Sequence, residues 1–446
     1  MSEASDEPLN LVVFSDDWGR HPSSCQHLVR HLMRRGAVRE VVWVNTIGTR
    51  RVRLSWGDAK RAAGKVGGVA RTLPPITWFW PAEEVLREAG GQQAEREARP
   101  RVVSPMMWPG FRAGWQRRFN AGRMVNAVRR AIDPGKRWVG LTTLPVTADV
   151  VEPLRDLPGG GVERWVYYGV DDFSVWPGLD GDVMDAMERK LVGEVDAICA
   201  VSETLVARVG GMLNRRGAEN AETSSRDVTH PGVAGSRVSR QDAKSPRRQV
   251  ELLTHGVNID GWDLRDVTPI DDWWTNVAPH PIFLFWGLLD ERMEYEWWWD
   301  LAGEGDCTAC EIGPIESESG GLNDLPHNVM PGRRDHAELP RWASWADVLV
   351  MPYRDMPVTR AMQPLKLLEY LATYKPVVVR RLPATEAWAD CCDVVDTAAD
   401  FVRVCRQRAE GGLPADQRAA RERRLPGESW SEKSRQLEVI LREGGV

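Results

Sequence analysis

The sequence has no disulfide framework and no long apolar run. Its seven cysteines are odd in number and scattered, which predicts a reducing compartment. No apolar run approaches the roughly 20 residues that a membrane-spanning helix needs. The acidic, polar N-terminus, MSEASDEPLN, predicts that there is no secretory signal. These absences together predict a cytoplasmic protein, either free or peripheral at the inner face of the membrane.

The sequence also lacks the marks of nucleic-acid and dinucleotide binding. A net charge of −6 argues against a general nucleic-acid binder. The loop after the first predicted strand has no G-x-G-x-x-G, so a nicotinamide or flavin cofactor has little support.

Short apolar runs alternate with helical patterns along the chain, which is typical of βα units on parallel sheets. A chain of 446 residues exceeds one ordinary core. We therefore predict an α/β protein of two doubly wound, Rossmann-like domains facing a cleft. The predicted parts are residues 1–213, a disordered insertion at 214–249, a second domain at 250–428 that opens with the strand Val250–Leu253, and a C-terminal helix at 429–446.

The segment Met351–Val379 is the most informative. It reads as a strand, a polar loop, a helix that opens near Leu365 and a second strand. A loop that leads into a helix at the carboxyl end of a strand is where such sheets bind phosphates. Lys366 would contact a diphosphate and Glu369 a ribose, with Leu365 and Arg360 beside them. The alternative is an exposed Lys–Glu pair on a helix.

The segment FWGLLDER predicts a strand, a turn at Gly287 and a helix start. Arg292, near that start, could bind a phosphate through its guanidinium fork. Alternatively, Glu291 and Glu294 pair with it.

Two loops of the first half follow strands and could contact an acceptor, or could simply be capping turns. The first loop carries four candidates, Asp16, Asp17, Arg20 and His21. The second carries Asp171, which could act as a base, and Asp172. Glu188 is predicted to be a helical surface residue and His255 a turn residue.

The stretch Trp108–Phe119 interleaves aromatic residues with arginines. It could contact an anionic membrane or a charged acceptor. The alternative, a solvated helix face with a core stripe, is the interpretation that we favour from sequence.

Several motifs together carry a family resemblance: FSDDWGRHPSS, VYYGVDDFSVWPG, THGVNID, FWGLLDER, ELPRWASWADVLVMPYRD and PLKLLEYLATYKPVVV. With these motifs the chain resembles the family 4 retaining glycosyltransferases of GT-B fold, and among them bacterial members similar to the teichuronic acid glycosyltransferases. Glu369 matches the second of the family's two motif glutamates, and Ala361 stands at the position of the first. Pro364 and Tyr374 stand where the family usually has glycine.

The resemblance implies transfer of a sugar, with retention, from a nucleoside diphosphate donor to a carbohydrate or lipid-linked acceptor in cell-surface polysaccharide synthesis. Lys366 and Arg292 would stabilise charge on the departing diphosphate. The C-terminal helix would cross back to the first domain. No metal or other cofactor is expected, because no Asp-x-Asp is placed to hold a metal on the diphosphate. The alternative, motivated by Ala361, is a non-catalytic nucleotide- or glycan-binding protein of the same fold.

Overall fold

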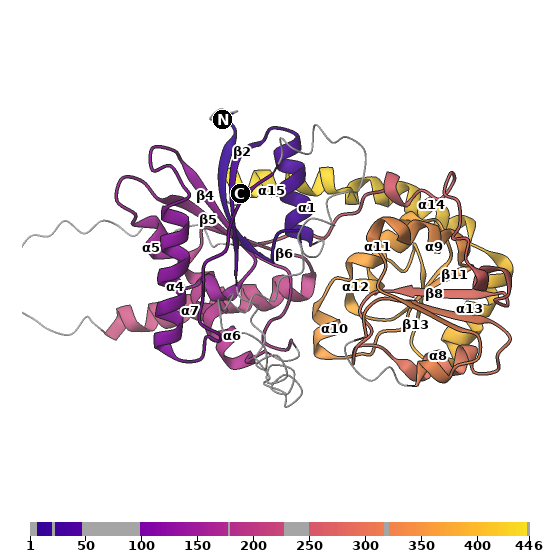
Figure 1. Ribbon diagram of the computed structural model, residues 1–446. Helices are drawn as coiled ribbons and strands as arrows, with labels where there is room; N and C mark the ends of the chain where they lie inside the picture. Colours follow the sequence, from indigo (N-terminus) through magenta and orange to yellow (C-terminus); the bar gives the residue numbers. More distant parts are fainter. Residues whose placement is uncertain are drawn as a thin grey trace, which may run out of the picture. The chain divides into compact units, whose positions relative to one another are not determined.

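The computed structural model describes residues 7–19, 23–46, 99–176, 179–226, 249–315 and 321–443. The chain divides into two compact units, and its elements form two parallel sheets (Figure 1). The predicted candidates Arg20 and His21 lie outside the described residues.

The first sheet has seven strands in the order β3-β2-β1-β4-β5-β6-β7. These strands are β1 (Leu9–Ser15), β2 (Val38–Asn45), β3 (Arg101–Val103), β4 (Trp138–Thr142), β5 (Val162–Gly169), β6 (Ala197–Ala200) and β7 (Val250–Leu252). The helices in this part of the chain are α1 (Ser24–Arg34), α4 (Gly114–Arg129), α5 (Val151–Arg155), α6 (Gly181–Glu194) and α7 (Glu203–Arg226). Every residue of β4 is buried, as expected for a strand with both faces covered.

The second sheet has six strands in the order β10-β9-β8-β11-β12-β13. They are β8 (Ile282–Trp286), β9 (Thr308–Ile312), β10 (Asn328–Gly332), β11 (Val348–Met351), β12 (Val377–Arg380) and β13 (Asp393–Val395). The helices here are α8 (Tyr295–Ala302), α9 (Leu339–Trp345), α10 (Pro357–Ala361), α11 (Leu365–Ala372), α12 (Pro383–Glu386), α13 (Ala398–Gly411), α14 (Ala415–Arg424) and α15 (Trp430–Glu443). Figure 1 shows α9 and α11 on one side of this sheet and α8 on the other.

Each sheet has a point where the strand order reverses. β1 lies between β2 and β4, and β8 lies between β9 and β11. Doubly wound sheets bind ligands at the carboxyl ends of the strands at this point. The ends of β1 and β8, at Ser15 and Trp286, are therefore the places where the fold favours a site.

The prediction of an α/β fold with two Rossmann-like domains is confirmed. Three details differ. β7 pairs with β6 and so belongs to the first sheet, whereas the sequence placed Val250–Leu253 at the start of the second domain. α7 continues to Arg226, through the start of the predicted insertion, whose residues 227–248 lie outside the described residues. The short strands β3 and β10 were not predicted, because three or five residues with Pro or Gly nearby carry little periodic signal.

All seven cysteines are buried and none forms a disulfide. In the described ranges, no helix is both long and apolar enough to cross a membrane. That the C-terminal helix, α15, crosses back to the first domain stays a prediction.

Candidate functional site

The site is built around Gly287, the first residue after β8. Its backbone has a φ of +146°, a conformation that residues other than glycine rarely adopt. A Cβ atom at this position would lie 1.9 Å from the Nζ of Lys366. The lysine ammonium thus occupies the space that the missing side chain leaves, at the reversal point of the second sheet. The predicted grouping of Gly287 with Lys366 is present in the structure.

The ammonium of Lys366 is held by aromatic groups. Its Nζ donates a hydrogen bond of 2.6 Å to the hydroxyl of Tyr353, which follows β11. It also lies 4.5 Å from the ring centroid of Phe285 and 5.2 Å from that of Tyr353. Among the described residues, no carboxylate lies within 4.0 Å of this nitrogen. The positive charge is positioned but not neutralised, so it is available to an anion.

Glu369, one turn further along α11, is 8% exposed and has both carboxylate oxygens engaged. Oε2 accepts a hydrogen bond of 3.1 Å from the indole Nε1 of Trp286, and Oε1 is hydrogen-bonded to Nε2 of His336 at 2.8 Å. The ring of Trp262 stacks on that of Trp286 with centroids 5.2 Å apart and planes 2° from parallel. These contacts hold the carboxylate in one orientation beside the end of β8.

The partners of Glu369 were not predicted. Trp286 lies within the predicted strand, next to Gly287, and that proximity could have drawn attention to it. His336 is 33 residues from Glu369 in sequence, and no local pattern links the two. The alternative interpretation of Lys366 and Glu369 as an exposed pair is wrong, because Glu369 is buried and is paired with other residues.

Arg292 is paired with a carboxylate two residues away in the sequence, that of Asp290. Its guanidinium contacts both oxygens of Asp290, with Nε at 2.9 and 3.0 Å and an ion-pair distance of 2.8 Å. Burial lowers the pKa of Arg292, but the hydrogen bond with Asp290 and the nearby negative charges, that of Asp290 among them, together outweigh burial, and the net pKa is raised. The pairing with Glu291 or Glu294 considered from sequence is not the one that forms, and Glu294 instead bonds Arg380 at 3.0 Å.

The Arg292 loop adjoins the loop that carries Tyr353. The backbone carbonyl of Arg292 accepts a hydrogen bond of 2.7 Å from the amide of Arg354. Arg292 therefore lies near the lysine's aromatic support, as a paired cation. An anion would have to share the guanidinium with Asp290.

The two remaining predicted donor residues differ in their placement. Leu365 is the first residue of α11, half-buried, and its backbone amide belongs to the first turn of that helix. Arg360 lies on the separate helix α10, is 58% exposed and pairs with Asp355 at 2.9 Å. Arg360 is thus a surface ion pair rather than part of the lysine's surroundings.

The loop after β1 holds Asp16 and Asp17. Burial raises the pKa of Asp16, the neighbouring charge of Asp17 raises it further, and a hydrogen bond with Ser23 lowers it. The backbone carbonyl of Asp16 accepts a hydrogen bond of 2.9 Å from Nε1 of Trp43, and that of Asp17 accepts one of 3.2 Å from the Gln26 amide. These contacts order the loop at the reversal point of the first sheet.

The loop after β5 holds Asp171 and Asp172. Asp172 is 9% exposed and forms an ion pair of 3.1 Å with Arg208 of α7, while Asp171 is half-buried. Glu188 is not a surface residue, as the sequence had predicted. It is buried and accepts a hydrogen bond of 2.7 Å from the hydroxyl of Tyr167. A tyrosine hydroxyl pointing in from β5 made a buried carboxylate possible there.

His255 is buried, as expected for a structural residue, and burial lowers its pKa to about 4. Its backbone amide donates to Oε1 of Gln363 at 2.8 Å. Within the described ranges, no three His, Cys, Asp or Glu side chains are grouped as metal ligands.

Comparison with known proteins gives one partial relative and many similar folds. No family model matches the chain. A stretch of 61 residues is 43% identical to the candidate teichuronic acid biosynthesis glycosyltransferase TuaH of Bacillus subtilis (strain 168), and it covers 14% of this chain and 15% of TuaH. The chain thus matches less than a sixth of that relative's length.

Solved structures match along nearly the whole chain. The UDP-forming α,α-trehalose-phosphate synthase of Burkholderia xenovorans superposes with a TM-score of 0.60 at 11% identity, covering 98% of this chain and 100% of that one. HepE of Anabaena, in complex with UDP, gives a TM-score of 0.56 at 9% identity, covering 97% and 99%. Identities this low show the fold alone. The chain therefore has the GT-B type of fold, two Rossmann-like domains, and a partial sequence relation to a candidate glycosyltransferase.

Proposed function

We propose that the protein is a glycosyltransferase that moves a sugar, with retention, from a nucleoside diphosphate donor to a carbohydrate or lipid-linked acceptor in cell-surface polysaccharide synthesis. The observation that carries the proposal is the ammonium of Lys366, which lies above Gly287 at the reversal point of the second sheet without a carboxylate partner among the described residues. The partial match to TuaH and the GT-B fold support it.

The geometry suits a diphosphate leaving group. During transfer, the bond between the anomeric carbon and the donor phosphate breaks, and negative charge develops on the diphosphate. A preorganised cation next to that charge stabilises the transition state more than the ground state. Lys366 is preorganised by Tyr353 and Phe285, so little rotamer entropy remains to be lost on binding. Arg292, already paired with Asp290, would add a second contact of smaller effect.

Glu369 would bind the donor ribose. Each carboxylate oxygen has one protein partner, so one lone pair of each oxygen remains for a ribose hydroxyl. The acceptor would lie against the loops of Asp16, Asp17, Asp171 and Asp172, with Asp171 as the candidate base. No metal or cofactor is part of the proposal.

The test is release of nucleoside diphosphate from a panel of uridine, guanosine and adenosine diphosphate sugars. We expect turnover with one donor class, a loss of about 100-fold or more in Lys366→Ala, of the size seen when one charge-stabilising donor is removed, and a large loss in Glu369→Ala. Lys136→Ala, a half-exposed lysine paired with Glu40, is the matched control and should keep full activity. The anomeric configuration of the product tests retention.

A second candidate is a non-catalytic nucleotide- or glycan-binding protein. The specific observation is Ala361, a buried methyl group where the resembled family carries its first glutamate. A thermal-shift panel with the three diphosphates separates the two candidates, because a bound nucleotide stabilises the native state by mass action. Stabilisation by a nucleotide with no turnover of any donor or acceptor would favour the binding protein. Neither stabilisation nor turnover would refute both.

A further inference from the structure

Large apolar side chains are exposed on one short segment that the proposed site does not use. Met106 is 71% exposed, and the rings of Trp108, Trp115 and Phe119 are 48%, 51% and 48% exposed. The rings of Trp108 and Trp115 are in edge contact, with centroids 5.2 Å apart. Trp115 and Phe119 are four residues apart on α4 and so share one helix face. Trp108, Trp115 and Phe119 therefore form an aromatic patch, and the exposed Met106 is two residues before Trp108 in the chain.

The same segment is strongly basic. From Arg101 to Ile132 the chain has seven arginines and no Asp or Glu, although the whole chain carries a net charge of −6. Arg118 is exposed on α4 and has no ion-pair partner among the residues of the described ranges. Arg112 and Arg117 find their partners outside the segment, in Asp180 at 2.8 Å and Asp149 at 3.7 Å. The local charge is therefore opposite in sign to that of the protein.

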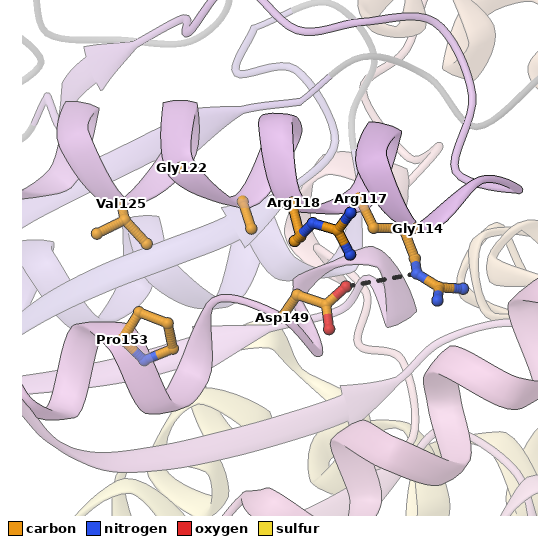
Figure 2. Close-up of a pocket in the computed structure, with 8 residues that line it drawn as sticks. Gly114, Arg117, Arg118, Gly122, Val125, Asp149 and Pro153 are labelled. Carbon is orange, nitrogen blue, oxygen red and sulfur yellow. Dashed lines mark ion pairs between the residues drawn. The ribbon is translucent and has the colours of Figure 1, made fainter.

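A groove of about 440 Å³ lies along α4, the helix that carries Trp115 and Phe119, and Figure 2 shows the residues that line it. Gly114, Gly122 and the two arginines Arg117 and Arg118 line it from α4, and Asp149 and Pro153 line the opposite side. Figure 2 shows the arginine side chains extending from α4 into the groove, with Arg117 turned towards Asp149. A Cβ atom at Gly122 would meet nothing within 4 Å, so this side of the helix is open.

The combination of half-exposed aromatic rings, a basic segment and an arginine, Arg118, without an ion-pair partner among the described residues fits the boundary between a bilayer and water. Tryptophan rings are favoured at the headgroup level, and arginines are attracted to anionic headgroups. We propose that the patch of Met106, Trp108, Trp115, Arg118 and Phe119 is a docking surface for an anionic lipid bilayer. The rings enter the headgroup region, and Arg118 contacts lipid phosphates at the mouth of the groove. This inference does not depend on the proposed transfer reaction.

The test is co-sedimentation of the full chain with vesicles, because 21 tryptophans would obscure an intrinsic fluorescence change. Vesicles of phosphatidylglycerol mixed with phosphatidylcholine are compared with vesicles of phosphatidylcholine alone. We expect binding to the anionic vesicles that weakens with salt and is much weaker with the neutral ones. Equal binding to both, or binding to neither, would overturn the proposal.

Variants locate the surface. Arg118→Glu should weaken binding by about five-fold or more, since each basic residue near an anionic surface contributes about that factor. The double variant Trp115→Ala with Phe119→Ala should weaken it by about ten-fold or more, because it removes two inserted rings. Arg423→Glu on α14 and Trp299→Ala on α8 are the matched exposed controls and should bind as the native chain does.

Unchanged binding in the α4 variants, or an equal loss in the controls, would refute the location. Competition by soluble glycerol 3-phosphate that abolishes vesicle binding would refute the surface in favour of a small-anion site in the groove. A circular dichroism melt of each variant separates loss of binding from loss of fold. Diphosphate release by the α4 variants, measured without vesicles, should be unchanged, which keeps this proposal distinct from the proposed function.

Discussion

Glutamine in place of Glu311 is expected to stabilise the protein at neutral pH, by an amount that grows with pH. Glu311 lies on β9, its side chain is fully buried, and neither carboxyl oxygen has a hydrogen-bond partner among the described residues. Burial raises the pKa of this carboxyl from 4.5 to about 8, and the nearby Asn328 side chain offsets only part of the rise. An unpartnered carboxylate in a core is unfavourable, so the folded chain keeps the proton.

The sign follows from proton binding in the two states. The unfolded chain releases the proton near pH 4.5, whereas the folded chain keeps it up to about pH 8. Stability is therefore lost as the pH rises between these two values, and the loss levels off above the higher one. At pH 7 the loss is about 3 kcal/mol, at ~1.36 kcal/mol for each pH unit above the unfolded-state value. Glutamine has the shape of the protonated carboxyl and does not titrate, so the variant escapes this loss.

The assay is thermal unfolding of the native chain and of Glu311→Gln from about pH 5 to about pH 9. We expect nearly equal melting temperatures at the acidic end and a variant that melts roughly 6 to 12 °C higher at neutral pH, for a unit of this size. Glu410→Gln, at an exposed position on α13, is the control and should melt like the native chain throughout. A difference between Glu311→Gln and the native chain that stays constant with pH, or a variant that is less stable near pH 8, would refute the reasoning.

Three further predictions concern the site and its surroundings. Gly287→Ala should weaken nucleotide binding by about ten-fold or more, because its Cβ would displace the Lys366 ammonium, which lies 1.9 Å from that position. Gly332→Ala is the control, since Gly332 also has a positive φ (+74°) but open space around it, and its nucleotide binding should not change. Calorimetric titration with the nucleoside diphosphate measures both affinities. Burial lowers the pKa of His255 from 6.5 to about 4. The stability that this residue contributes above pH 6.5 should therefore be lost as the pH falls towards 4. His255→Asn does not titrate, so its free energy of unfolding, measured in urea, should fall less over this pH range than that of the native chain. Trp286→Phe removes the indole donor to Glu369, 3.1 Å away. The variant should bind nucleotide about ten-fold more weakly, and it should lose about 1 to 3 kcal/mol of stability because Glu369 is buried. Nucleotide affinity equal to that of the native chain would contradict a positioning role.

The position of the proposed donor site could be read from the sequence because its signals are local. The run from Met351 to Val379 contains a buried strand, a loop and a helix that opens at Leu365, and the structure has these elements in place. Lys366 and Gly287 belong to two such local patterns. The reversal of strand order at β8 then brings them together, as the general rule for doubly wound sheets predicts.

The partners of these residues could not be predicted in the same way. Arg292 was expected either to contact a phosphate or to pair with a glutamate beside it. It pairs instead with Asp290, two residues earlier in the turn after β8, whose carboxylate also accepts a hydrogen bond from the backbone amide of Arg292. Asp172 was weighed as an acceptor contact or a capping residue, and it forms an ion pair with Arg208 of α7. Such pairings depend on the path of the backbone and on which side chains share a buried space, and neither is visible in a periodic pattern.

The order of apolar and polar residues along the chain was sufficient for the α/β class, for two sheets and for most of their strands, because burial on a parallel sheet requires short apolar runs at regular intervals. It was also sufficient to locate α11, the helix of the proposed donor site. The tertiary structure was needed to assign β7 to the first sheet, to bury Glu188, to give Glu369 its partners Trp286 and His336, and to set the Lys366 ammonium over Gly287. The physical reason is that secondary structure follows from neighbours in sequence, whereas the charge, orientation and pKa of a site residue follow from neighbours in space. Trp286 and Glu369, for example, are 83 residues apart in the sequence.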